Sequence, residues 1–137
     1  IIADGVHVHP KMLKFAVENK STDKVSLISD SIAPTGLGDG DYNIWDENIS
    51  VIDSKTQNEK GNIAGSVITM LDAFQRVLSL GFSDIEVSKM ASLNPAKLLG
   101  IEKHYGSIEV GKRADLVVID ENAQIKNVFI NGKVVKL

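Results

Sequence analysis

The sequence predicts an α/β fold on two observations. First, an apolar start, a helical pattern from Pro10 to Val17 and an apolar, partly β-branched run at residues 25–28 follow one another in the order strand, helix, strand. This order is typical of a βαβ unit, whose two strands are parallel and joined by a right-handed crossover. Second, short strands without intervening helices fill the end of the chain. We therefore expect a first domain over residues 1–105 and a second over residues 106–137.

Composition narrows the function classes. The 137 residues suffice for a domain with a core, and the net charge of −3 does not favour nucleic acid or an anionic membrane as partner. No apolar stretch is long enough to cross a bilayer. The chain contains no Cys, which excludes disulfides, a thiolate nucleophile and zinc–thiolate ligation and fits a cytoplasmic location.

Asp30 is the first candidate functional residue. It ends the run at residues 25–28, which predicts a strand buried on both faces, and a loop with Pro34 and Gly36 follows. Carboxyl ends of parallel strands are where α/β folds place their chemistry. Asp also starts many turns, and on the residues alone this structural role is the more common one.

His7 and His9 form a His-x-His pair after the first apolar residues. On a strand both side chains would point to the same face, as in metal sites. The alternative is one histidine that faces a substrate or caps a turn and one that faces solvent. We favour this alternative because His104 is the only other histidine of the chain.

The middle of the chain predicts an insertion and a helix. Residues 31–40 form a glycine-rich loop, either a lid or a connection, and a β-hairpin insertion follows at about 41–60, with 56–60 as an exposed turn. Small residues at 61–66 lead into a helix over 67–78, with Ser66 as its N-cap. Such a loop either presents N–H groups to a polar ligand or is a plain cap.

The remaining elements are short. Ser83 and Glu86 predict a capping box, and Asn94 is expected to cap a short helix over 95–99. Asn131-Gly132 predicts a type I′ hairpin turn. We expect the last strands at residues 107–110, 114–119, 125–130 and 133–135. Because so few strands make a poor core, they are expected to complete a sheet with strands from elsewhere.

Several motifs together carry a resemblance to a known family. They are Ala-Asp-Gly-Val-His-Val (3–8), Asp-Ser-Ile-Ala-Pro-Thr-Gly (30–36), Ile-Ala-Gly-Ser (63–66), Asn-Pro-Ala (94–96) and Gly-Lys-Arg-Ala-Asp-Leu (111–116). The chain resembles the C-terminal part of the N-acetylglucosamine-6-phosphate deacetylases of the amidohydrolase superfamily. The last two motifs are shared across the superfamily, whereas the first three are typical of the deacetylases.

The resemblance implies a fold and site residues. The fold would be the C-terminal part of a metal-dependent (β/α)8 barrel with strands of a small β-sandwich. Asp30 matches the catalytic Asp, which acts as general base toward a metal-bound water and then as general acid toward the leaving amine. His7 matches a substrate-contacting His that could also polarise the amide. Ile63, Ala64 and Gly65 match a backbone segment that contacts the substrate.

The resemblance also implies what this chain lacks. The family's metal ligands, a Glu and two His for zinc or ferrous iron, lie on barrel strands upstream, so no metal ligand is certain here. We therefore expect a C-terminal fragment, which the start without Met also suggests, inactive alone and part of a homodimer in full-length form. The substrate could equally be N-acetylgalactosamine 6-phosphate. A non-catalytic α/β binding module is the alternative of another class.

Overall fold

The computed structural model describes residues 1–136 of the chain. The chain divides into two compact units, Ile1–Ala91 and Ser92–Leu137, and each is described here by itself. The sequence predicts a different boundary, near residue 106, between the barrel and the β-sandwich that the resemblance implies, and this boundary stays a prediction. None of the helices within residues 1–136 has both the length and the apolar character needed to span a membrane.

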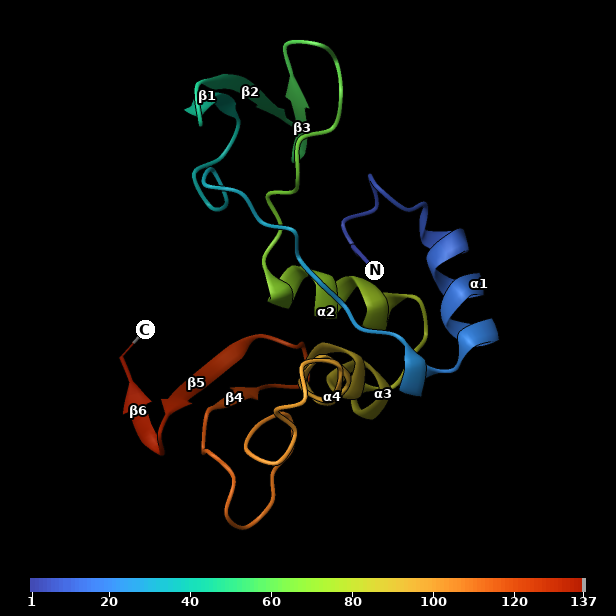
Figure 1. Cartoon of the computed structure of the whole chain (residues 1–137), viewed down its shortest axis with the longest axis vertical. Helices are drawn as coiled ribbons and strands as arrows, with labels where there is room; N and C mark the ends of the chain where they lie inside the picture. Colours follow the sequence, from blue (N-terminus) through green and yellow to red (C-terminus); the bar gives the residue numbers. More distant parts are fainter. Residues whose placement is uncertain (137) are drawn as a thin grey trace. The chain divides into compact units, whose positions relative to one another are not determined.

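Helices supply a large part of the core of the first unit, together with strand and loop residues, and Figure 1 shows these helices. They are α1 (Pro10–Lys20), the 3-10 turn η1 (Thr22–Lys24), α2 (Met70–Ser79) and α3 (Asp84–Ser88). Pro10 stands in the first turn of α1, where its missing N–H costs no hydrogen bond. The helices bury apolar side chains that include Leu13, Val17, Phe74, Val77 and Val87. Residue spacing of three and four places these side chains on one face of each helix.

The predicted hairpin strands are present as part of a three-stranded antiparallel sheet, and their role as an insertion stays a prediction. Its strands are β1 (Gly40–Ile44), β2 (Glu47–Ile52) and β3 (Lys55–Asn58) in the order β1-β2-β3. Two two-residue turns connect them, at 45–46 and 53–54, and all four turn residues have positive φ. The expected exposed turn at 56–60 is wrong in part, because residues 55–58 form β3. Figure 1 shows the sheet joined to the helices by the segments before β1 and after β3.

The strand expected at residues 25–28 is not formed. A single parallel bridge joins Ile2 to Ile28, so the predicted parallel direction is correct although no ladder develops. Leu27 is buried, whereas Ile28 is 48% exposed, so the run is not buried on both faces as expected. The segment has little backbone pairing to extend it: the N–H of Ile28 bonds to Ile1, and the N–H of Leu27 bonds to Met90.

Two expected helix caps are wrong. Thr69, not Ser66, caps α2, because Thr69 and Asp72 form a reciprocal capping box. Asn94 is not the N-cap of α4 but its first residue, since α3 continues through the π-helix η2 (Lys89–Leu93) into α4 (Asn94–Leu98). The Ser83–Glu86 capping box of α3 is confirmed.

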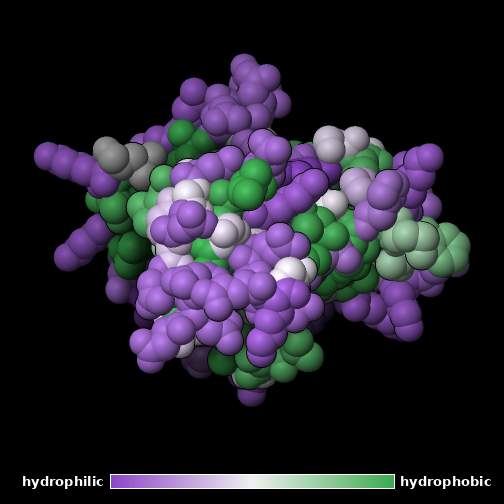
Figure 2. All heavy atoms as spheres, turned by 90° about the horizontal axis from the view of Figure 1, so that it is seen from above, coloured by the Kyte–Doolittle hydropathy of each residue, from purple (hydrophilic) through white to green (hydrophobic). Residues whose placement is uncertain are grey.

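In the second unit, α4 precedes the antiparallel strands β4 (Leu116–Ile119), β5 (Ile125–Ile130) and β6 (Lys133–Val135). Asn131 and Gly132 have positive φ in the predicted hairpin turn. The strand expected at 107–110 is absent, and residues 102–112 contain turns and bends instead. Apolar side chains of this sheet stay exposed, among them Val117 at 59% and Val134 at 60%. The view coloured by hydropathy likewise shows hydrophobic atoms at the surface between hydrophilic ones (Figure 2).

Candidate active site

Asp30 lies where residues 30–32 are joined to Ser66 by backbone hydrogen bonds. Its carbonyl oxygen accepts a hydrogen bond of 2.8 Å from the N–H of Ser66, and the carbonyl of Ser66 accepts one of 2.9 Å from Ile32. These bonds form a parallel bridge between Ser31 and Ser66. Asp30 has a φ of 54°, a left-handed conformation that Asp tolerates better than most residues. Its side chain is exposed and so is available to a ligand.

Gly65 packs directly against Asp30. A Cβ atom at Gly65 would lie 2.6 Å from Cγ2 of Ile32 and 3.2 Å from the carbonyl oxygen of Asp30. The same atom would lie 3.8 Å from Oδ2 of Asp30. With a φ of +67°, position 65 also has a conformation that favours glycine. The structure therefore brings together two residues that the sequence predicts for the site.

Thr56 holds the other side of the segment at residues 63–65. Its hydroxyl donates a hydrogen bond of 2.6 Å to the carbonyl of Gly65 and accepts one of 3.3 Å from the N–H of Ala64. Thr56 is 3% exposed, so these bonds are shielded from water. Thr56 was not among the predicted site residues, because the sequence predicts an exposed turn at this position. No hydrophobic alternation could have marked Thr56, because all four residues of β3 are polar. Ile63 itself is 49% exposed.

His7 is hydrogen-bonded to Asp4, which was not among the predicted site residues. Its Nδ1 lies 2.7 Å from Oδ2 of Asp4. The other carboxylate oxygen of Asp4 accepts hydrogen bonds of 2.9 Å from the N–H groups of Val6 and His7. Asp4 is 5% exposed. The spacing Asp-x-x-His in a Gly-containing turn was the signal that could have identified this pair.

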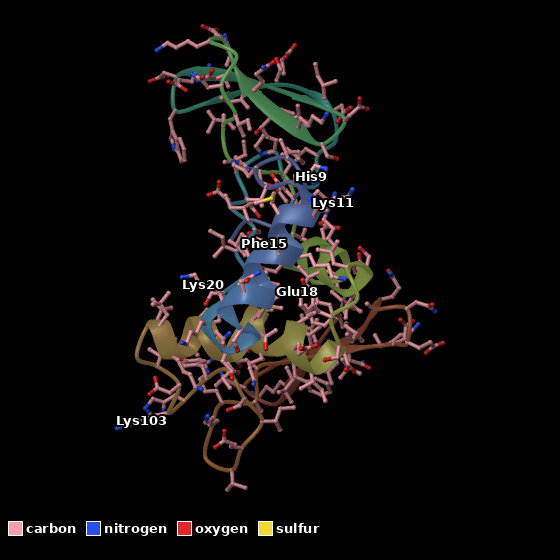
Figure 3. All side chains as sticks on the ribbon, turned by 90° about the vertical axis from the view of Figure 1, so that its right-hand side faces the viewer. His9, Lys11, Phe15, Glu18, Lys20 and Lys103 are labelled. Atoms are coloured by element: carbon pink, nitrogen blue, oxygen red, sulfur yellow. The ribbon has the colours of Figure 1, made fainter. Side chains whose placement is uncertain are left out.

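His9 is not a partner of His7 but caps a helix. Its Nδ1 accepts a hydrogen bond of 3.3 Å from the N–H of Lys11 at the start of α1. Figure 3 shows His9 at this end of the helix, with Lys11, Phe15 and Glu18 following along α1. Residues 4–8 form bends instead of a strand, so the geometry assumed for a His-x-His metal pair does not exist. The non-metal alternative, one histidine as a cap, agrees with this arrangement.

Two opposing effects act on Asp4. Burial raises the pKa of its carboxyl group, but hydrogen bonds from the His7 ring and from the N–H groups of His7 and Val6 favour the carboxylate and leave its pKa below the ordinary value. The carboxylate is therefore the stable form at neutral pH. A carboxylate accepts hydrogen bonds and cannot donate them.

A metal site is not complete within this chain. Among residues 1–136 there is no group of three or more His, Asp or Glu side chains that could hold a metal ion. The Asp4–His7 pair contributes two such side chains and uses them for each other. The residues present therefore do not fit the divalent metal that the resemblance implies, and its identity stays a prediction.

Comparison with known proteins identifies the family to which this chain belongs. Residues 1–135 match the amidohydrolase family, and the chain belongs to this family. Over 135 residues the chain is 33% identical to the N-acetylglucosamine-6-phosphate deacetylase of Bacillus subtilis. Over 134 residues it is 31% identical to the N-acetylgalactosamine-6-phosphate deacetylase of Escherichia coli O157:H7. These matches cover 98% and 97% of this chain but 34% and 35% of the relatives, so the chain spans about a third of their length.

Solved structures confirm the expected fold class. The chain matches the N-acetylglucosamine-6-phosphate deacetylase of Thermotoga maritima with a TM-score of 0.92 and 33% identity, over 98% of this chain and 37% of that one. It matches a variant of the Mycobacterium smegmatis enzyme in complex with N-acetyl-D-glucosamine-6-phosphate with a TM-score of 0.89 and 31% identity, over 98% of this chain and 36% of that one. The chain thus has the fold of one part of such an enzyme.

Proposed function

We propose that this chain carries part of the active site of a deacetylase that acts on N-acetylglucosamine 6-phosphate, with Asp30 as its acid–base residue. The arrangement of Asp30 supports this role. Its backbone is held by the bridge to Ser66, while its carboxylate is exposed beside a residue without a side chain, Gly65. A held backbone with an accessible carboxylate is what general acid–base catalysis requires. The names of the relatives supply the substrate class.

The proposed reaction is hydrolysis of the N-acetyl amide. The carboxylate of Asp30 takes a proton from a water molecule while the oxygen of that water adds to the amide carbonyl carbon. The protonated Asp30 then gives the proton to the amide nitrogen as the C–N bond breaks. The products are acetate and glucosamine 6-phosphate. His7 and the backbone of residues 63–65 would bind and orient the sugar phosphate.

This chain alone is not expected to catalyse the proposed reaction. It spans about a third of the length of the Bacillus subtilis and Escherichia coli O157:H7 relatives, and residues 1–136 contain no group of three or more His, Asp or Glu side chains that could bind a metal ion. We therefore propose that the metal ligands come from sequence outside this chain and that the 137 residues alone are inactive. The cytoplasmic location and the homodimer stay predictions.

A second candidate substrate is N-acetylgalactosamine 6-phosphate. A relative named for that substrate is 31% identical to this chain, close to the 33% of the Bacillus subtilis enzyme. The two sugars differ only in the orientation of one hydroxyl group. Parallel assays of acetate release from both sugar phosphates decide between them by their ratio of kcat/KM.

The test is an acetate-release assay on the longest polypeptide that contains these residues, as wild type and as Asp30→Asn. Asp53→Asn is a matched control, because both aspartates are exposed and have similar positive φ values of 54° and 51°. We expect Asp30→Asn to lower kcat by about 10²- to 10⁴-fold and the control to leave it unchanged. Wild-type-like turnover by Asp30→Asn, or no acetate release from either sugar phosphate by the wild type, would overturn the proposal.

A further inference from the structure

Asp4 decides which nitrogen of His7 can face a ligand. The distance of 2.7 Å between Nδ1 of His7 and Oδ2 of Asp4 is that of a strong hydrogen bond, so one proton lies between the two atoms. Asp4 is 5% exposed, and its other oxygen already accepts two backbone N–H groups. A carboxylate surrounded by three donors is stabilised in its ionised form. The shared proton therefore belongs to the ring.

We infer that Asp4 is a positioning residue that holds His7 in the Nδ1–H form, so that His7 meets its ligand only through Nε2. In the neutral ring Nε2 is then an acceptor, suited to a hydroxyl or amide N–H of a sugar substrate. Donation to a carbonyl oxygen requires the doubly protonated ring. The ligand chemistry rests on the proposed deacetylase function, whereas the form of the ring does not.

The loop around Asp4 is built to hold this geometry. Gly5 has a φ of +79° and allows the chain to turn back, so that the N–H groups of Val6 and His7 both reach Oδ1 of Asp4. The carboxylate is thereby oriented before it meets the ring, and its free oxygen points at Nδ1. A cation also lies near this loop, because a Cβ atom at Gly5 would lie 3.4 Å from Nη1 of Arg76.

Asp4→Asn is the most informative variant, because the Asn side chain has the same shape as Asp but replaces one hydrogen-bond acceptor by a donor. The amide oxygen can still accept the two backbone N–H groups, which places the NH₂ group opposite Nδ1 of His7. An NH₂ group donates, so Nδ1 must become the acceptor and the ring proton must move to Nε2. The same exchange of tautomer follows loss of the carboxylate in the Ser-His-Asp triad.

The measurement is a long-range ¹H–¹⁵N correlation spectrum of the ¹⁵N-histidine-labelled chain, recorded about two pH units above the ordinary His pKa of about 6.5. We expect Nδ1–H for His7 in the wild type and Nε2–H in Asp4→Asn. His9 and His104 are internal controls whose signals should stay in place, and His7→Gln assigns the resonance.

Two results would overturn the inference: a wild-type His7 that carries its proton on Nε2, or a folded Asp4→Asn chain with an unchanged His7. If Asp4→Asn does not fold, the wild-type spectrum alone decides. Because this readout needs no turnover, it separates failure of the inference from failure of the proposed function. In the active polypeptide, Asp4→Asn should raise KM more than it lowers kcat.

Discussion

The carbonyl oxygen of Asp30 and the N–H of Ser66 lie 2.8 Å apart and join the two segments of the candidate site. This hydrogen bond places Gly65 against Asp30, with no side chain between them. The hydroxyl of Thr56 holds the same segment from β3. Asp30 is thus positioned by residues more than 25 positions away in sequence, and substitutions on either side of this contact test the arrangement.

Gly65→Ala should destabilise the chain more than Gly36→Ala. Both positions have positive φ, which costs about 1–2 kcal/mol for a residue with a Cβ. Gly36 has open space around it, whereas a Cβ at Gly65 would clash with Ile32 and crowd the backbone of Asp30. We expect a further loss of about 1–3 kcal/mol at Gly65. Urea unfolding of both variants measures the difference, and equal losses would contradict the packing described here.

Thr56→Val should weaken the link between the β1–β3 sheet and residues 64–65. Val preserves the shape but removes the hydroxyl that bonds to both Ala64 and Gly65. Because the carbonyl and N–H then lose a buried partner, we expect a loss of about 1–3 kcal/mol in the free energy of unfolding. Thr56→Ser keeps the hydroxyl and should retain most of the stability. Amide hydrogen exchange at Ala64 should become faster in Thr56→Val but not in Thr56→Ser.

Asp30→Asn should leave folding intact. The side chain is exposed, and Asn adopts positive φ as readily as Asp, so the free energy of unfolding should change by less than about 0.5 kcal/mol. Asp30→Ala should cost more, because Ala lacks the local hydrogen bonds that make this conformation tolerable. If Asp30→Asn unfolded the chain, Asp30 would have a structural role and a loss of activity would say nothing about catalysis.

Asp4 should make stability depend on pH at the acid end. Its pKa is lower in the folded chain than in the unfolded chain, so the contribution of the carboxylate is present above the unfolded value of about 3.9 and is lost as pH falls through the folded value. Asp4→Asn removes this titration. The difference in free energy of unfolding between wild type and variant should therefore shrink below about pH 4. Urea unfolding at a series of pH values measures it, and a constant difference would exclude the effect.

The sequence predicted features that depend on neighbouring residues. The Ser83–Glu86 capping box, the turn at Asn131-Gly132 and the antiparallel pairing of β1 with β2 are confirmed, because each follows from local hydrogen bonding or from residues that accept positive φ. Asp30 and His7 were already candidates from the residues alone, and the motifs of the resemblance gave them and Gly65 their roles, which stay predictions. The parallel direction of the Ile2–Ile28 contact also followed from element order.

The tertiary structure decided which residues support the selected ones. Thr56 could not be distinguished from other polar residues before β3 paired with β2 and buried it. Ser66 looked like a helix cap until the bridge to Ser31 placed it in a backbone pairing. The run at 25–28 reads as a buried strand, yet its burial depends on which segments pack against it. Local sequence determines turns and caps, whereas burial and long-range hydrogen bonds depend on partners that only the folded chain brings together.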